Sequence, residues 1–130
     1  MGFARILMLV AAAAVTATAL FSIFFMVEQS EADEKTITVY MYEYYFSPDE
    51  ITVGRNVKVL IVFVNNGTYP HNAYLSQEKK DLVHVLYPGD SESVELFFRE
   101  RGVFEVLCTV SYPAPVSHYE LGMRAKIIVR

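Results

Sequence analysis

From residue 36 onward the sequence alternates between apolar and polar residues with a period of two, which is the period of side chains along a β-strand. The alternation is clear over Thr36–Tyr45, and a long run rich in β-branched residues follows at Val57–Val64. Further strands are expected at Ile51–Val53, Asn72–Leu75, Leu82–Leu86, Ser93–Phe98, Phe104–Val110 and Arg124–Val129. No amphipathic helical pattern follows residue 35. Short strands at this spacing, divided by turn residues, predict an all-β sandwich over residues 36–130, a length suited to a single core.

The first part of the chain has a different character, because no charged residue occurs from Ile6 to Val27. Arg5 precedes this run, and acidic residues follow it at positions 28, 31, 33 and 34. A helix over these 22 residues would be about 33 Å long, enough to cross the hydrocarbon core of a bilayer. We predict one N-terminal transmembrane helix that anchors the chain over residues 1–27, followed by an acidic linker over residues 28–35.

A cleaved signal peptide is the alternative interpretation of this segment, since Ala17-Thr18-Ala19 resembles a cleavage site. The apolar run continues well beyond it, whereas the apolar part of a signal peptide spans only about 7–15 residues. The sequence therefore favours an uncleaved, single-pass anchor in the cell membrane. Arg5 on the short side and acidic residues on the long side place the domain on the extracytoplasmic side.

Composition excludes some classes of function. The net charge is −4 and both signs are scattered along the chain, so there is no basic stripe for nucleic acid. No Gly-x-Ser-x-Gly or comparable nucleophile motif is present, which argues against a hydrolase. We therefore expect neither a nucleic-acid partner nor a small-molecule substrate.

Four residues with metal-binding side chains stand out at turns and strand ends: His71, Cys108, His118 and Met123. Each one alone is more often structural. Cys108 is the only cysteine and has the strand parity of Phe104 and Val106, so its thiol points to the apolar side. Taken together, a thiol, two imidazoles and a thioether form a soft, mixed donor set of the kind that holds one redox copper ion. The set indicates electron transfer.

Several motifs, in the same order along the chain, resemble those of the cupredoxin, or blue copper, family. They are Phe46–Val53, Pro70-His71-Asn72, Pro88–Ser91, Gly102–Val110 and Gly122-Met123, and the resemblance covers essentially all of residues 36–130. With the predicted anchor, the chain is similar to the sulfocyanin branch. The resemblance implies a Greek-key β-sandwich with one copper ion.

By the same resemblance, His71, Cys108 and His118 would be equatorial copper ligands and Met123 the weak axial ligand. Asn72 would hydrogen-bond to the cysteine loop and stiffen it. His118 would be the ligand nearest the surface, through which the electron leaves. Exposed side chains beside it would form the docking rim: Tyr112, Pro113, Pro115, Val116 and Tyr119.

One spacing departs from the family pattern, because nine residues separate Cys108 from His118 where two to four are more usual. His84 is therefore an alternative third ligand. A long ligand loop also occurs in the dinuclear CuA domain of oxidase subunit II, but that domain needs a second cysteine where this chain has Tyr112.

The resulting expectation is a membrane-anchored mononuclear blue copper protein that carries single electrons between respiratory membrane complexes, such as a terminal oxidase. A structural, subunit II-like component of an oxidase that lacks the dinuclear centre is one alternative. A copper-delivery protein is the other, although it would expose several Met and His ligands.

Overall fold

The computed structural model of the protein describes residues 34–130, and every regular element within them is a β-strand. The nine strands are β1 (Lys35–Tyr42), β2 (Tyr45–Ser47), β3 (Glu50–Val53), β4 (Lys58–Asn65), β5 (His71–Leu75), β6 (Lys80–Leu86), β7 (Ser91–Phe97), β8 (Gly102–Leu107) and β9 (Arg124–Val129). The prediction of an all-β fold is thus confirmed for this part of the chain.

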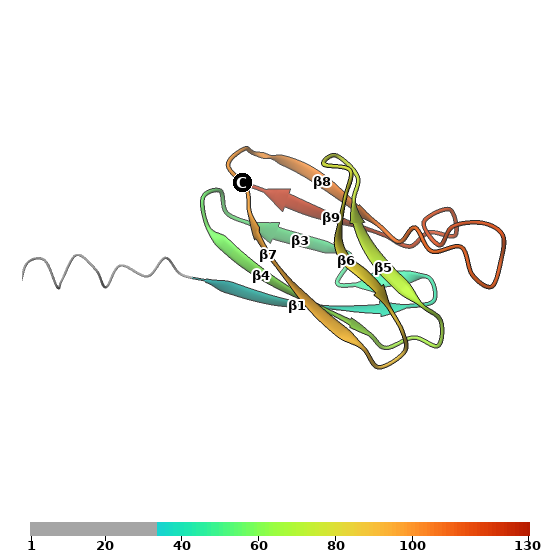
Figure 1. Cartoon of the computed structure of the whole chain (residues 1–130). Helices are drawn as coiled ribbons and strands as arrows, with labels where there is room; N and C mark the ends of the chain where they lie inside the picture. The colour runs from blue at the N-terminus through green and yellow to red at the C-terminus, as the bar shows by residue number, and fades with distance from the viewer. Residues whose placement is uncertain (1–33) are drawn as a thin grey trace, which may run out of the picture. The chain divides into compact units, whose positions relative to one another are not determined.

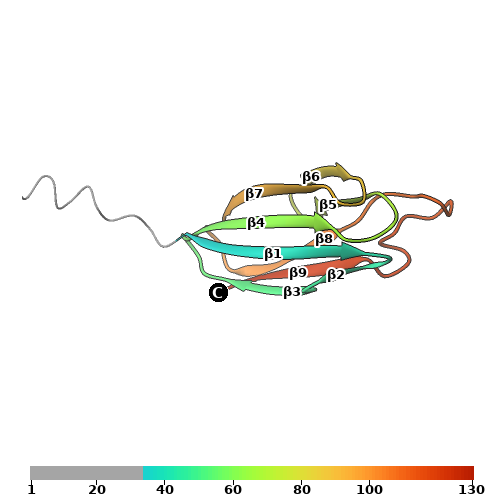
Figure 2. The same cartoon turned by 90° about the horizontal axis from the view of Figure 1, so that it is seen from below.

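The strands form two sheets, with the orders β2-β1-β4-β7 and β3-β9-β8-β5-β6. β1 pairs in parallel with β4, and β3 pairs in parallel with β9, whereas all other neighbours are antiparallel. Seen from below, the sheets lie one behind the other as the two layers of a sandwich (Figure 2). The predicted β-sandwich is therefore present.

Alternating burial along the strands builds the core between the layers. In β4 the side chains of Val59, Ile61 and Phe63 are buried, and those between them are more exposed. In β9 the same alternation buries Ala125, Ile127 and Val129. Burying an aliphatic or aromatic side chain contributes roughly 1.5–3 kcal/mol, so this repeated pattern drives the two sheets together.

Two expected strands end differently in the structure. The segment predicted as one strand over Thr36–Tyr45 turns at Glu43 and Tyr44, so that β2 folds back on β1 with Tyr42 opposite Tyr45. The strand predicted over Phe104–Val110 ends at Leu107. Lys35, assigned above to the linker, begins β1. At Glu43 and after Leu107, a local turn or loop takes over where the alternating pattern alone would extend the strand.

The predicted anchor over residues 1–27 and most of the linker lie outside the described residues. Within residues 34–130, no helix has the length and apolar character that crossing a bilayer requires.

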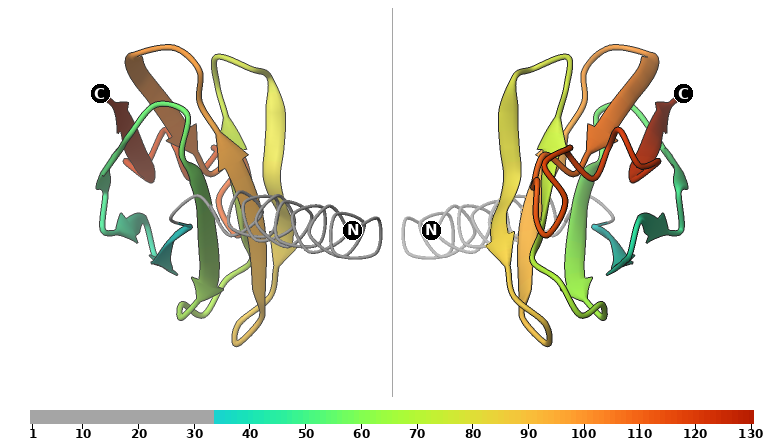
Figure 3. Two further views of the ribbon diagram at one scale, coloured as in Figure 1. Left: turned by 90° about the vertical axis from the view of Figure 1, so that its left-hand side faces the viewer. Right: turned by 90° about the vertical axis from the view of Figure 1, so that its right-hand side faces the viewer.

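The two ends of the sandwich differ in what they carry. β1 begins at the end where the C-terminus lies, and the backbone amide of Arg55 there donates to the carbonyl of Arg130 (Figure 1). The opposite end carries the long orange-red loop between β8 and β9, which faces the viewer in the right-hand view of Figure 3. Residues 108–123 therefore lie at the far end of the domain from the start of β1.

At this loop end, the inward-facing positions change from apolar to polar. Asn65 continues the inward set of β4 after Phe63, and His71 opens the inward set of β5 before Ala73. Cys108 follows the inward Val106 directly after β8. Because inward positions recur every second residue along a strand, they place a layer of polar and sulfur side chains at the loop end of the apolar core.

Asn65 is completely buried and organises the turn that leads to His71. Its side-chain amide donates to the carbonyls of Tyr69 and Leu86, both at 2.8 Å, and its carbonyl oxygen accepts from the amide of Gly67 at 2.9 Å. All the polar atoms of this buried side chain are therefore used.

Asn65→Ala leaves these three backbone groups without their partner. Because unsatisfied buried polar groups are costly, we expect the free energy of unfolding to fall by about 3 kcal/mol. The neighbouring Asn66→Ala is the control: Asn66 is exposed and its side chain makes only a long contact of 3.4 Å to the Tyr42 hydroxyl, so the loss should stay below about 0.5 kcal/mol. Urea unfolding of the metal-free protein measures both, and equal losses would contradict this role for Asn65.

Candidate metal centre

Three of the four predicted site residues converge at the loop end of the sandwich. Cys108 Sγ lies 3.5 Å from His118 Nδ1 and 3.8 Å from His71 Nδ1, and the two Nδ1 atoms are 3.1 Å apart. All three side chains are buried, and together they form a group capable of holding a metal ion. The structure therefore brings together residues that are up to 47 positions apart in the sequence.

Met123 lies at the same place in the fold. Its side chain is completely buried, its carbonyl accepts from the amide of Cys108 at 3.2 Å, and its amide donates to the carbonyl of His118 at 3.0 Å. The bond between Cys108 and Met123 continues the pairing of β8 with β9 by one step beyond Leu107 and Arg124. Cys108 and Met123 are thereby fixed side by side at the base of the loop.

The long spacing between Cys108 and His118 is absorbed outside the site. The amide of His118 donates to the carbonyl of Val110 at 2.7 Å, and the amide of Tyr119 donates to the carbonyl of Cys108 at 2.9 Å. Residues 111–117 therefore form an excursion that is closed at its base. His118 keeps its position beside Cys108 despite the insertion.

Asn72 ties the His71 strand to the cysteine loop, as the family resemblance implied. Its side-chain carbonyl accepts from the amide of Thr109 and its side-chain amide donates to the Thr109 hydroxyl, both at 2.8 Å. This two-point contact restrains the distance between His71 and Cys108, each of which is adjacent in sequence to one of the partners.

Each imidazole ring is held at its Nε2 atom by a group that only accepts hydrogen bonds. His71 Nε2 lies 3.2 Å from Oε1 of Glu43, and His118 Nε2 lies 2.5 Å from the carbonyl oxygen of Tyr112. Both Nε2 atoms must therefore carry the proton, which leaves the lone pair of each neutral ring on Nδ1. Both lone pairs then face the thiol.

Glu43 is a site residue that sequence reasoning missed. It follows β1 with the parity of the buried Val39 and Met41, so its carboxylate reaches the interior at the loop end. This parity was the available signal, but the segment was interpreted as one continuous strand. Beyond His71, the carboxylate accepts hydrogen bonds from the amides of Thr68 and Tyr69 at 2.6 and 2.7 Å.

The surroundings set the charge states of these groups. Burial raises the pKa of the Cys108 thiol more than the amides of Asn72 and Val110 lower it. Burial also lowers the pKa of His71, against the opposing effect of its hydrogen bond to Glu43. Burial alone would raise the pKa of Glu43, yet the Tyr69 and Thr68 amides and the His71 ring hold it below its ordinary value of 4.5. At neutral pH the metal-free site thus holds a thiol, a neutral His71 and a charged Glu43.

The donor set fits a single copper ion. With bonds of about 2.0 Å to nitrogen and about 2.3 Å to sulfur, two ligands of one ion lie about 3.2–3.7 Å apart at angles near trigonal or tetrahedral. The two observed nitrogen–sulfur separations, 3.5 and 3.8 Å, match this within about 0.1 Å, and the nitrogen–nitrogen separation of 3.1 Å is about 0.2 Å shorter than two nitrogen ligands would show. Two imidazoles, one thiol and a nearby thioether are the donors that suit both oxidation states of copper.

His84 is not part of this group. It lies on β6 with its side chain 85% exposed and pairs with Glu92, whose Oε1 is 3.2 Å from its Nδ1. The alternative in which His84 replaces His118 at the site is therefore wrong.

His118 itself is buried, with an exposed fraction of 1%, while the other three candidate ligands have exposed fractions of 0%. The excursion over residues 111–117 covers the ring and accepts its Nε2 proton at the Tyr112 carbonyl. Of the predicted rim, Tyr112, Pro113, Pro115 and Val116 are exposed, whereas Tyr119 is half-buried beneath the guanidinium of Arg124.

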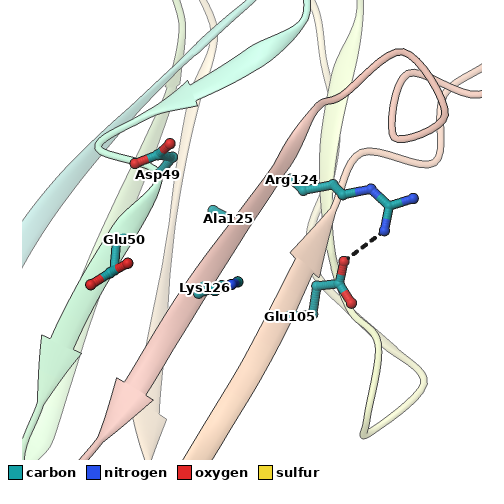
Figure 4. Close-up of a pocket in the computed structure, with 6 residues that line it drawn as sticks. All are labelled: Asp49, Glu50, Glu105, Arg124, Ala125 and Lys126. Carbon is teal, nitrogen blue, oxygen red and sulfur yellow. Dashed lines mark hydrogen bonds and ion pairs between the residues drawn. The ribbon is translucent and has the colours of Figure 1, made fainter.

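A separate pocket of about 200 Å³ lies on the outer face of the second sheet, over β3, β9 and β8 (Figure 4). Asp49, Glu50, Glu105, Arg124, Ala125 and Lys126 line it, and Arg124 forms an ion pair with Glu105 at 2.9 Å. Its mixed charges and lack of imidazole or sulfur ligands distinguish it from the copper-type donor set.

The buried thiol makes the stability of the metal-free protein depend on pH. Folding raises the pKa of the Cys108 thiol above its ordinary value of 9.0. The stability that the protonated thiol contributes is therefore present below pH 9.0 and is lost as the pH rises through the folded pKa. Between about pH 8 and about pH 10, the free energy of unfolding of the wild type should therefore fall relative to that of Cys108→Ala. Urea unfolding across this range tests it, and parallel curves for the two proteins would contradict a buried, neutral thiol.

Comparison with known proteins agrees with this fold. Reduced auracyanin from the photosynthetic bacterium Roseiflexus castenholzii is 22% identical, with a TM-score of 0.61 over 77% of this chain and 99% of that chain. Auracyanin A, a blue copper protein from Chloroflexus aurantiacus, is 21% identical, with a TM-score of 0.61 over 75% of this chain and 100% of that chain. The metal-binding domain of a Cu(I)-exporting P-type ATPase from Streptococcus pneumoniae is 14% identical, with a TM-score of 0.58 over 77% and 89% of the two chains.

No curated protein sequence matches the chain. The family described as cupredoxin-like domain matches residues 6–129, which is almost the whole sequence. With the two-sheet sandwich and the buried His, Cys and His group at one end, this match establishes the family: the chain belongs to the cupredoxin-like domain family.

Proposed function

We propose that this protein is a blue copper electron carrier that binds one copper ion through His71, Cys108 and His118, with Met123 as a weak axial ligand. The observation that carries the proposal is the convergence of the two Nδ1 atoms and the thiol within 3.8 Å of one another in a buried site. Bound copper supplies a one-electron couple, and the protein supplies the environment in which it works.

The protein's part is to hold its ligands in one arrangement for both oxidation states. The bonds of Asn72 to Thr109 and of Cys108 to Met123 fix the ligand segments to the sandwich. The apolar side chains beneath the site exclude water. Little has to move when an electron enters or leaves, which favours rapid transfer.

His118 offers a route for the electron to the surface although it is buried. Its Nε2–H donates to the carbonyl of Tyr112, and the Tyr112 side chain is 59% exposed. The excursion over residues 111–117 therefore supports a role as the docking surface for a redox partner. We propose a respiratory membrane complex or terminal oxidase as that partner, bound weakly and briefly.

Burial of the whole ligand set argues against copper delivery. A protein that hands copper to another one needs a ligand that an incoming donor can reach, yet His71, Cys108, His118 and Met123 are all nearly inaccessible. A closed site keeps its metal and exchanges only the electron.

Copper titration of the purified protein tests the proposal. The wild type should bind one equivalent of copper and, when oxidised, show the intense visible absorption of copper–thiolate charge transfer. Cys108→Ser should abolish that band while the far-UV spectrum stays that of a β-protein. Met123→Leu should retain both copper and colour, because a thioether contributes only a weak bond.

The matched control is His84→Gln, which alters the exposed histidine and should leave the absorption unchanged. A Cys108→Ser protein that stays coloured would place the site elsewhere. Absence of copper uptake by the wild type would leave a metal-free structural subunit of an oxidase as the better interpretation.

We also propose that the charge-free run Ile6–Val27 anchors the chain in the cell membrane, with the domain on the extracytoplasmic side. The full chain should then remain with membranes after carbonate washing, whereas residues 31–130 expressed alone should be soluble. A mature N-terminus near Leu20, measured by mass spectrometry, would instead show a cleaved signal peptide.

A further inference from the structure

We propose that Glu43 is a positioning residue for the metal site. It fixes the His71 ring at Nε2, on the side away from the candidate ligand atom, and its negative charge lowers the reduction potential of bound copper. The proposal rests on the copper site proposed above. It assigns a role to a carboxylate that lies beside a candidate ligand without belonging to the ligand group itself.

The carboxylate is held in place from several sides. One oxygen, Oε1, accepts from the amides of Thr68 and Tyr69 and from Nε2 of His71 at 2.6, 2.7 and 3.2 Å. Gly67 packs against the same group, and a side chain at position 67 would collide with it. The turn that carries these amides is itself held by buried Asn65. Glu43 is thus a built feature of the site and not a freely moving surface acid.

The two imidazoles differ in the group that accepts the hydrogen bond from Nε2. His118 donates to the neutral carbonyl of Tyr112, whereas His71 donates to a charged carboxylate. A carboxylate draws the Nε2 proton more strongly, which makes the opposite Nδ1 a better donor to a metal. The asymmetry makes Nδ1 of His71 the more electron-rich of the two nitrogen donors.

The sign of the effect on the potential follows from charge. The cupric ion carries one more positive charge than the cuprous ion, so a nearby negative charge and a more electron-rich ligand both stabilise the oxidised state more. Removing the charge must therefore raise the reduction potential. Because the Glu43 side chain is 23% exposed, solvent screens part of this effect.

Glu43→Gln is the sharpest variant, because all three hydrogen bonds end on one oxygen. The amide oxygen of glutamine keeps these acceptor contacts while the charge is lost. In the full chain, purified in detergent and loaded with copper, the variant should retain one copper and its colour. Its equilibrium should shift about tenfold towards the cuprous form, which is about 59 mV for a one-electron couple.

Glu92→Gln is the matched control, since Glu92 also accepts from a histidine at 3.2 Å but pairs with exposed His84. It removes the same charge and should shift the equilibrium less than twofold. Equal shifts in the two variants, or no shift in Glu43→Gln, would overturn the proposed tuning role.

The positioning role has a readout that needs no metal. In the metal-free protein, ¹⁵N NMR should show His71 with its proton on Nε2, in the wild type and in Glu43→Gln. Glu43→Ala should give a mixture of tautomers at His71 and leave His118 unchanged. An unaltered His71 signal in Glu43→Ala would contradict the positioning role. Failure of the wild type to bind copper would refute the proposed function and leave this tautomer test intact.

Discussion

The rings of His71 and His118 are each held at Nε2 by a hydrogen-bond acceptor, and the ability of the site to bind a metal depends on this constraint. A carboxylate and a carbonyl cannot donate, so each neutral ring turns a bare nitrogen towards the other across 3.1 Å. Two lone pairs at that distance repel unless a proton or a cation lies between them. The buried thiol adds a third donor to the same point. The fold thus places three electron-rich atoms where a soft cation relieves their mutual repulsion.

The position of this site follows from strand periodicity at one end of the sandwich. The inward positions of β4, β5 and β8 are apolar along the core and become Asn65, His71 and Cys108 where the strands reach the loop end. Core packing and ligand placement are therefore consecutive parts of one pattern. The same apolar layer that stabilises the domain lies under the polar groups and keeps water from them, which strengthens the electrostatic interactions within the site.

The parts predictable from sequence were those that depend on local pattern. The two-residue period predicted the strands, and the parity of Cys108 with Phe104 and Val106 predicted its inward thiol correctly. Glu43 was missed because a turn at Glu43 and Tyr44, which the alternating pattern continues across, brings its carboxylate to the turn before His71. The place of His118 beside Cys108 depends on a loop closed by a bond between His118 and Val110, which no local pattern indicates. The parity of Glu43 with Met41 signals an inward side chain, but no spacing encodes its contact with His71.

Three of the four candidate ligands lie on one segment, and its ends are fixed by the bond between Cys108 and Met123. The inner closure at Val110 places residues 111–117 outside this fixed base, and the Tyr112 carbonyl reaches back to the His118 ring. Substitutions of exposed side chains in this excursion, such as those of Pro113, Pro115 and Val116, change the outer surface, while the backbone carbonyl of Tyr112 still accepts from His118. Recognition of another protein and the chemistry of the site can therefore diverge independently during evolution, each through its own stretch of the same short loop.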